Sequence, residues 1–466
     1  MQKIGIIGGG FAGTMTAVHL IQNSLEPIEI FIINENETFN TGIAYNPYSK
    51  HQLLNVITAK MSAFADRPNH FLDWVMSNTD YIHQDENIVA NAFMPRYIYG
   101  KYLIDIWKDA EAQAKSKGIL VHVIHSNVEN IENATPHFSI QLANGEVIQT
   151  DKCVIATGNQ LPRNQRIVNT AFYTSSKYFQ NPWNIDSVKG TQTERDVLII
   201  GNGLTMVDTV LGLLEQGFKG NIYSISPNGF NILPHRHNGM KYTKLAEEIR
   251  DDMNLNDLMR LVFKHIKTVR SLGVSAEPII DSLRPYTQNI WRRLSEKEKM
   301  TFMARLRHLW GVARHRIPLQ IHDKIQQMRI DHKLHIYAGK IHNMEERMGR
   351  VNVEFLNKKM QELQTIQVDR VINCTGPETD ISILENGFLR NLWNQGILSQ
   401  DILKLGVNAD LNTYEIINQE GKKIDGLYTI ASNLKGLLWE STAVNELRTQ
   451  AEKLAKNLLE STEVTA

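Results

Sequence analysis

Cysteine is nearly absent from this chain of 466 residues. The two that occur, Cys153 and Cys374, each lie in an apolar run, and neither belongs to a Cys-x-x-Cys pair. Dithiol reductases need two neighbouring redox cysteines to pass electrons to a disulfide, so the sequence argues against this class. It argues equally against a metal site built from cysteine ligands.

The chain also lacks an excess of charge and any long hydrophobic run. Its 50 Lys and Arg residues balance 50 Asp and Glu residues, so net charge favours neither a nucleic acid nor an anionic membrane as partner. No apolar stretch approaches the ~18 residues of a membrane span, and no basic and apolar leader precedes the first expected strand. We therefore expect a cytoplasmic protein with a small-molecule partner, whose oligomeric state the sequence does not indicate.

Two glycine-rich turns are the most informative features present. Gly8-Gly9-Gly10-Phe11-Ala12-Gly13 follows the apolar run 3–7, and Gly201-Asn202-Gly203-Leu204-Thr205-Met206 follows the run 196–200. Glycine suits such a strand-to-helix turn because a dinucleotide pyrophosphate approaches the backbone closely and rests on the positive end of the helix. Two turns predict FAD at the first and a nicotinamide nucleotide, NADH or NADPH, at the second. The expected binding residues are Gly8, Gly10, Phe11, Ala12 and Gly13, and Gly201, Gly203, Leu204 and Thr205.

The first turn is expected to open a βαβ unit, with a helix over 11–22 and a second strand over 28–33. A dinucleotide site of this type uses an acidic residue near the end of that second strand to accept the ribose hydroxyls. Glu35 is the candidate, although Asn34 can occupy the same place and leave Glu35 as an exposed loop carboxylate.

Two later segments repeat one signal. Residues 151–158 and 369–376 are apolar strand-like runs that end in Thr-Gly, at Thr157-Gly158 and Thr375-Gly376. Each lies downstream of its own glycine turn, so the pair predicts a duplicated architecture in which the Thr-Gly turn passes close to the cofactor.

Between about 228 and 318 the pattern predicts helices without strands. Ser295 and Glu298 form a capping box before an expected helix over 300–312, and Pro318 closes the segment. We expect an FAD-binding domain over 1–165 and 377–466, and an NAD(P)-binding domain over 190–376 interrupted by a helical insertion at about 235–330.

The insertion is basic. From 284 to 316 it has nine Lys or Arg against two Glu, an excess of seven. This run is either a solvated helical face or a positive wall facing the phosphates of a cofactor or an anionic substrate, with Arg236, Arg314 and Arg316 as candidates. His235-Arg236-His237 and Arg314-His315-Arg316 lack metal-ligand spacing, so we interpret both as lining of a nicotinamide or substrate cleft and expect no metal.

Near the C-terminal end, the run 425–431 predicts a strand that returns to the first domain. A long helix is expected from Glu440 or Ser441 to Leu459. If its N-terminus faces the flavin pyrimidine, its dipole would stabilise the anionic reduced ring; the alternative is an ordinary packing helix.

Motifs along nearly the whole chain resemble the FAD/NAD(P)-binding proteins of the YdhS type, which are similar to flavin-dependent monooxygenases and include urate-hydroxylase-like and amino-acid N-hydroxylase-like members. The matching segments are GGGFAG (8–13), TGIAY (41–45), LLNVITAKMSAFADRPNHFLDW (53–74), MPRYIYGKYL (94–103), ATGN (156–159), LIIGNGLTMVD (198–208), DSLRP (281–285), RHR (314–316), INCTGP (372–377) and GLLWESTAVNELR (436–448). The resemblance implies an α/β fold with two Rossmann-like dinucleotide-binding domains, the two-dinucleotide-binding flavoprotein fold, with a helical insertion.

The resemblance also implies cofactor contacts. Asn55, Met61 and Ser62 would lie along the isoalloxazine, and Arg96 would help to hold FAD. Val128, Thr157, Gly158, Glu440, Ser441 and Thr442 complete the expected set. After the strand ending at Ser226, related proteins often carry arginines that pair with the 2′-phosphate of NADPH, whereas this chain has Pro227-Asn228-Gly229. That departure favours NADH, or a distant arginine such as Arg236.

Three functions share these motifs. The leading one is a monooxygenase, in which NAD(P)H reduces FAD and a C4a-hydroperoxyflavin then transfers one oxygen atom of O2 to the substrate. The expected substrate is a small polar molecule, with or without nitrogen. The second is an NAD(P)H oxidase or flavin reductase. The third is a non-catalytic nucleotide-binding, redox-sensing protein. The catalytic residues and the substrate are not indicated by the sequence.

Overall fold

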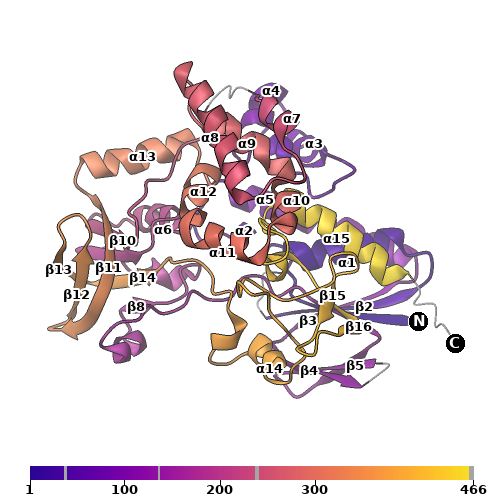
Figure 1. Ribbon diagram of the computed structural model, residues 1–466. Coiled ribbons are helices and arrows are strands. Elements are labelled where there is room, and N and C mark those ends of the chain that lie inside the picture. Colours follow the sequence, from indigo (N-terminus) through magenta and orange to yellow (C-terminus); the bar gives the residue numbers. More distant parts are fainter. Residues whose placement is uncertain (36–38, 135–136, 237–240, 461–466) are drawn as a thin grey trace.

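The computed structural model describes residues 1–35, 39–134, 137–236 and 241–460. Two parallel-type sheets form its frame, and they lie on opposite sides of the molecule (Figure 1). The six-stranded sheet has the order β15-β16-β7-β1-β2-β3, and the seven-stranded sheet has the order β13-β12-β11-β10-β9-β14-β8. This arrangement confirms the predicted α/β fold with a parallel sheet for each glycine turn.

The six-stranded sheet is built from both ends of the chain. Strands β1, β2, β3, β7 and β16 are parallel, and β15 is antiparallel at one edge. Its central strands are apolar on both faces, as expected of a sheet with cover on each side. The bounds are β1 Gln2–Ile7, β2 Ile28–Asn34, β3 Leu120–His125, β7 Lys152–Ile155, β15 Glu415–Ile417 and β16 Lys423–Thr429.

The seven-stranded sheet comes from the middle of the chain. Strand β11 is parallel to β10 over its first half and antiparallel to β12 over its second half. The bounds are β8 Tyr178–Phe179, β9 Asp196–Ile200, β10 Asn221–Ser226, β11 Leu334–Arg347, β12 Arg350–Asn357, β13 Glu362–Val368 and β14 Arg370–Asn373. A separate antiparallel sheet holds β4 Val128–Ala134, β5 His137–Leu142 and β6 Val147–Thr150.

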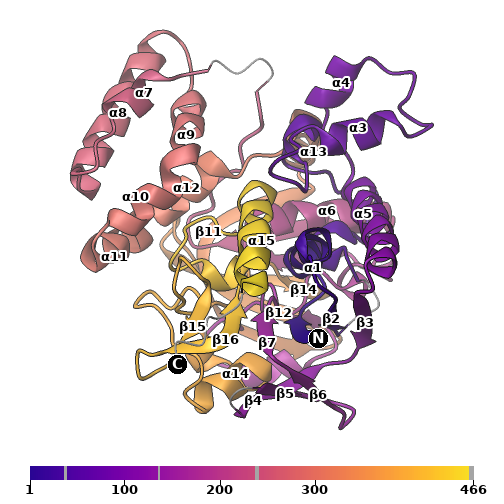
Figure 2. The same cartoon turned by 90° about the vertical axis from the view of Figure 1, so that its right-hand side faces the viewer.

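Helices cover the sheets. Helix α15 packs on α1, and Figure 2 shows both with α5 above the first strands. These helices bury the apolar face of the six-stranded sheet and form its largest core. Outside the insertion the bounds are α1 Phe11–Asn23, α2 Gly42–Tyr45, α3 His70–Met76, α4 Glu86–Asn91, α5 Arg96–Ser116, α6 Leu204–Glu215, α14 Phe388–Asn394 and α15 Val444–Leu459.

The predicted insertion is helical throughout its described residues, and Figure 1 shows it above and between the two sheets. Its bounds are α7 Lys244–Glu248, α8 Leu255–Ser271, α9 Glu277–Leu283, α10 Thr287–Arg293, α11 Glu296–Arg305, α12 Arg307–Arg314 and α13 Leu319–Ile330. The domain boundaries drawn from the sequence remain a prediction.

Two expected helix bounds were wrong. The capping box at Ser295 and Glu298 is present, but its helix begins at Glu296 and breaks at Leu306, rather than running over 300–312. Helix α15 begins at Val444 rather than at Glu440 or Ser441, because Glu440 has a positive φ of 66° that no helix accommodates.

Candidate functional site: two facing dinucleotide turns

The first glycine turn has the geometry that a pyrophosphate requires. A Cβ added at Gly8 (φ +111°) would lie 2.2 Å from the Ala156 carbonyl oxygen, and one at Gly13 would lie 1.9 Å from the Gly8 carbonyl oxygen. A Cβ at Gly10 would contact only the Cα atom of Gly42, at 3.7 Å. The turn is therefore closed toward the protein and open in front of Gly10.

The second turn repeats this geometry. A Cβ at Gly201 (φ +109°) would lie 2.4 Å from the Cys374 carbonyl oxygen, and a Cβ at Gly203 would meet nothing within 4 Å. The third glycine position holds Met206, which is buried. Helices α1 and α6 both begin without a side-chain cap, so their first N–H groups are available to phosphate oxygens. Both turns therefore fit a dinucleotide.

The Thr-Gly segments stand beside the turns in matching register. The Ala156 amide donates to the Ile7 carbonyl and the Cys374 amide to the Ile200 carbonyl, each at 2.8 Å. Gly158 has a positive φ of 71° and open space around its Cα, and Thr157 lies 3.5 Å from the amide nitrogen of the Asn433 side chain. The predicted duplication is confirmed by this equivalence of hydrogen bonds.

At the end of β2 the structure distinguishes the two candidates for ribose binding. The Gly9 amide donates to the Asn34 side-chain oxygen at 3.0 Å, whereas Glu35 is exposed. Asn34 thus supports the turn itself, and Glu35 remains a predicted ribose ligand located at its outer rim.

The residues expected along the isoalloxazine lie in one connected stretch. Met61 and Ser62 are buried, and the Ser62 hydroxyl donates to the carbonyl of Arg67 at 2.6 Å. Asn55 is half-buried, and its carbonyl accepts a hydrogen bond of 2.9 Å from His235 Nε2. Val128, at the start of β4, is buried. Ser62 is thus occupied by its own loop, so its contribution to a flavin site would be structural.

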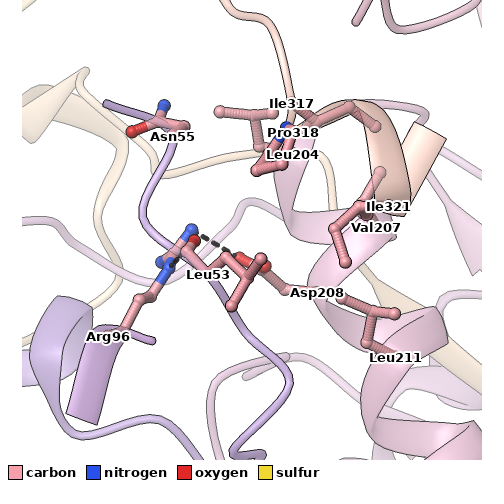
Figure 3. A pocket seen from close by; sticks show the side chains of 10 residues that line it. All are labelled: Leu53, Asn55, Arg96, Leu204, Val207, Asp208, Leu211, Ile317, Pro318 and Ile321. Carbon is pink, nitrogen blue, oxygen red and sulfur yellow. Dashed lines mark hydrogen bonds and ion pairs between the residues drawn. The ribbon is translucent and has the colours of Figure 1, made fainter. Parts of the chain in front are cut away.

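Arg96, at the start of α5, is mostly buried beside α6, the helix that follows the second turn. Its Nη2 atom forms an ion pair of 3.0 Å with Asp208 of α6, and its Nε donates to the Leu53 carbonyl at 3.1 Å. Figure 3 shows this pair between the segment carrying Asn55 and the helix that follows the second turn. Burial raises the pKa of Asp208, and the adjacent guanidinium of Arg96 lowers it.

A pocket of about 290 Å³ of empty volume adjoins that ion pair. Leu53, Asn55 and Arg96 line it from one side, and residues of α6 and of the insertion's end line it from the other, as Figure 3 shows. The α6 and insertion residues are Leu204, Val207, Asp208, Leu211, Ile317, Pro318 and Ile321. Three residues predicted from the sequence, Asn55, Arg96 and Leu204, therefore meet at one place.

The C-terminal segment is held by the insertion. Glu440 accepts hydrogen bonds of 2.7 Å from Trp310 Nε1 and from Arg314 Nε. Both side chains of the Arg314–Glu440 ion pair are about nine-tenths buried, with 9% and 11% exposed. The backbone of Glu440 is left-handed, with a φ of 66°. At a non-glycine residue this conformation costs on the order of 1–3 kcal/mol, and it is common at functional sites. Ser441 is buried and its hydroxyl donates to the Ala431 carbonyl at 2.6 Å, whereas Thr442 is exposed.

The three arginines proposed as a positive wall are all paired. Arg236 Nε lies 3.1 Å from Glu277, Arg314 pairs with Glu440, and Arg316 forms an ion pair with Asp281. Arg314 and Arg316 are buried, so they are not a solvated face. Their charges are largely compensated, which weakens the idea of an anion-facing wall at these positions. His237, the third residue of the 235–237 cluster, lies outside the described residues.

A larger cavity, which is open to solvent, lies where α10 of the insertion faces the first turns of α15, and its empty volume of about 650 Å³ includes part of that solvent. Both charged side chains and side-chain amides line this cavity. One carboxyl oxygen of Glu446 and the side-chain nitrogen of Gln288 have no hydrogen-bond partner there, and burial raises the pKa of Glu446. The lining residues are Gln288, Arg292, Leu411, Tyr414, Leu438, Asn445, Glu446, Thr449, Gln450 and Lys453.

Sequence reasoning missed several residues of this region. Asp208 and Glu446 lie within the matching motifs and Trp310 lies outside them, but none of the three was singled out, because the role of each depends on residues that are distant along the chain. Among the described residues, no group of three or more His, Cys, Asp or Glu gathers as a metal site would require.

Comparison with known proteins agrees with the geometry. Residues 5–160 match the protein-family model described as FAD-NAD(P)-binding. The fold is that of a two-dinucleotide-binding flavoprotein. A search of the curated proteins gives no match.

Solved structures share this fold over nearly their full length. An ornithine N-hydroxylase of Kutzneria sp. 744, with reduced FAD, NADP⁺ and L-ornithine, is 12% identical with a TM-score of 0.65, covering 98% of this chain and 99% of that one. L-lysine 6-monooxygenase of Pseudomonas syringae is 14% identical with a TM-score of 0.65, with the same coverage of 98% and 99%. The bacillithiol disulfide reductase of Staphylococcus aureus is 14% identical with a TM-score of 0.53, again over 98% and 99%.

Within the described part of the chain, no helix combines the length and apolar character needed to cross a bilayer. The cytoplasmic location remains a prediction.

Proposed function

We propose that this protein is an FAD-dependent oxidoreductase that uses NAD(P)H and O2 to hydroxylate a small polar substrate. The observation that carries the proposal is the pair of equivalent glycine turns, together with the Arg96–Asp208 ion pair that links α5 to α6, the helix that follows the second turn. A flavin held at the first turn and a nicotinamide nucleotide at the second would meet at this junction, which is the requirement for hydride transfer.

The first turn, the segment that carries Asn55 and Met61, and the start of α15 would each have a role toward FAD. Gly8, Gly10 and Gly13 and the uncapped start of α1 would hold the pyrophosphate. Asn55 and Met61 would lie along the flavin ring, and the uncapped N-terminus of α15 would face its pyrimidine end. When bound, FAD supplies the hydride and oxygen chemistry, and the protein supplies orientation and exclusion of water.

The cavity between α10 and α15 is the proposed substrate site. The insertion and the C-terminal segment that would contact the flavin both line it. Its unpartnered Glu446 oxygen and its cations Arg292 and Lys453 suit a small molecule carrying both a positive nitrogen and an anionic group. Proteins of this fold named as ornithine, lysine and cadaverine hydroxylases support amines as the first substrates to test.

The test is turnover of the purified holoprotein with NADH or NADPH in air, with and without each amine. A hydroxylase consumes nucleotide faster with its substrate and yields a product heavier by one oxygen atom, detected by mass spectrometry. Peroxide formed at the same rate without any product would indicate the oxidase or reductase instead. Absence of turnover with every acceptor would indicate a nucleotide-binding protein without catalysis.

A further inference from the structure

The carboxyl end of β10 is the place where a nucleotide at the second turn would present its adenosine ribose. The Gly201 amide donates to the Ile225 carbonyl at 2.8 Å, as the Gly8 amide does to Ile33 in the first sheet. Ser226 and Pro227 therefore stand where Asn34 and Glu35 stand in the first sheet. No acid occupies either position, so nothing there would repel a 2′-phosphate.

The structure brings a cation to this position from a distant part of the chain. Ser226 pairs in register with Ala338 of β11, and the Ala338 carbonyl accepts a hydrogen bond of 2.9 Å from the Lys358 amide. The Lys358 Nζ then donates to the Pro227 carbonyl at 2.6 Å. The turn between β12 and β13 thus delivers a lysine to the end of β10.

The charge of Lys358 is not neutralised by the protein. Lys358 is exposed, and within the described ranges no carboxylate forms an ion pair with it. Among the described residues its Nζ has one hydrogen-bond partner, the Pro227 carbonyl, which is a single acceptor for three N–H donors. This situation differs from that of Arg236, Arg314 and Arg316, each of which has a carboxylate partner.

We propose that Lys358 binds the 2′-phosphate of NADP(H) and makes this nucleotide the preferred one. The inference rests on the proposed function. A phosphate beside the unpaired ammonium of Lys358 gains a charge-assisted hydrogen bond that the ribose hydroxyl of NAD(H) cannot form. It also reverses the expectation of NADH drawn from Pro227-Asn228-Gly229, since the cation is not local in sequence.

The experiment is calorimetric binding of NADP⁺ and NAD⁺ to the oxidised, flavin-loaded protein. The same titrations with adenosine 2′,5′-bisphosphate and with 5′-AMP isolate the 2′-phosphate from the nicotinamide end. The variant is Lys358→Gln. Lys359→Gln is the matched control, because Lys359 is an adjacent exposed lysine whose Nζ makes no hydrogen bond or ion pair among the described residues.

We expect the wild type to bind NADP⁺ at least about tenfold more tightly than NAD⁺. Lys358→Gln should weaken the binding of NADP⁺ and of adenosine 2′,5′-bisphosphate about tenfold, and should leave the binding of NAD⁺ and 5′-AMP unchanged. Lys359→Gln should change none of these affinities.

Equal affinity for the two nucleotides, or a Lys358→Gln loss that is the same for NADP⁺ and NAD⁺, would overturn the inference while leaving the proposed oxidoreductase intact. Binding of neither nucleotide to a fully flavin-loaded protein would overturn the second turn as a nucleotide site, and with it the proposed function.

Discussion

The two glycine turns share their hydrogen bonds but differ in how much protein surrounds them. At the first turn Phe11, Ala12 and Gly13 are all buried, and α1 approaches so closely that Gly13 has no room for a Cβ. At the second turn Gly203 is exposed, Leu204 and Thr205 are half-exposed, and the third glycine is replaced by Met206. A ligand at the first turn would be enclosed and retained, whereas one at the second would exchange with solvent. The contrast suits a resident flavin and a diffusing nicotinamide nucleotide.

Valine at the second glycine of each turn should give the largest effect and test that contrast directly. Gly10→Val should abolish flavin binding, and Gly203→Val should keep the flavin but lose nicotinamide nucleotide binding. Both positions have space for a Cβ in the protein itself, so the branched side chain conflicts with the pyrophosphate and not with the fold. Flavin absorbance per protein and calorimetric titration measure the two outcomes. A Gly10→Val protein with full flavin content would show that the first turn is misassigned.

The insertion's attachment to the first site should be the next most sensitive feature. Arg314→Gln leaves the buried Glu440 carboxylate without its cation, and should lower the free energy of unfolding by about 3–5 kcal/mol. Urea denaturation followed by tryptophan fluorescence measures this change. Arg314→Gln combined with Glu440→Gln should recover part of the loss, since no buried charge remains. Arg305→Gln, an exposed residue of the same insertion, is the control and should stay within about 0.5 kcal/mol of the wild type. An equally small effect at Arg314 would argue against a buried pair.

The Arg96–Asp208 ion pair joins the two sites and should have an intermediate effect. Arg96→Met and Asp208→Asn should each destabilise the protein by about 1–3 kcal/mol, because each leaves a polar partner in a mostly buried junction. Both should slow the reduction of flavin by NAD(P)H, measured by stopped-flow absorbance, with flavin content unchanged. Flavin loss in Arg96→Met alone would show instead that Arg96 holds FAD directly, as the family resemblance implies.

His235, which links the loop beyond β10 to Asn55 of the first site, should give the smallest effect at neutral pH, because its contribution to stability changes only in acid. Burial, and then the charge of Arg316, lower its pKa to about 4. The folded protein therefore resists protonation that the unfolded chain accepts below about pH 6.5. The contribution of His235 to the free energy of unfolding is therefore fully present above about pH 6.5. It is lost as the pH falls toward 4, and the loss is about 2 kcal/mol at pH 5. His235→Gln should reduce the loss of unfolding free energy between pH 7 and pH 5 by that amount. If His235→Gln has the same pH dependence of unfolding free energy as the wild type, the His235 imidazole is exposed to solvent rather than buried.

Local patterns predicted the fold well. The strand at 28–33, the helix from Phe11 and the two Thr-Gly strands agree with β2, α1, β7 and β14. Glycine turns and apolar runs depend on neighbouring residues, so a single sequence contains them. The bounds that were wrong, at Leu306 and at Glu440, depend on tertiary contacts: Glu440 takes its left-handed backbone in a segment held by Trp310 and Arg314.

The candidate site could be predicted only in part, for the same reason. Asn55, Arg96 and Leu204 lie on motifs, and the structure brings them to one pocket. The sequence did not predict that Arg96 pairs with Asp208, although both residues lie on motifs, because the two are far apart along the chain. The sequence placed Arg314 and Arg316 in a basic run, but their compensation by Glu440 and Asp281 required distant carboxylates. Lys358 lies far along the chain from Pro227, so the local sequence after β10 suggested no cation at all.

The order of the strands along the chain has a consequence for biosynthesis. The seven-stranded sheet is formed by residues 178–373, whereas the six-stranded sheet needs β16, which pairs with β7 from more than 250 residues earlier. During synthesis on the ribosome, all strands of the seven-stranded sheet emerge before the last strand of the six-stranded sheet does. Closing the earlier site must await emergence of β16 and α15, so a truncated or stalled chain would expose the open edge of β7 and the apolar face of α1.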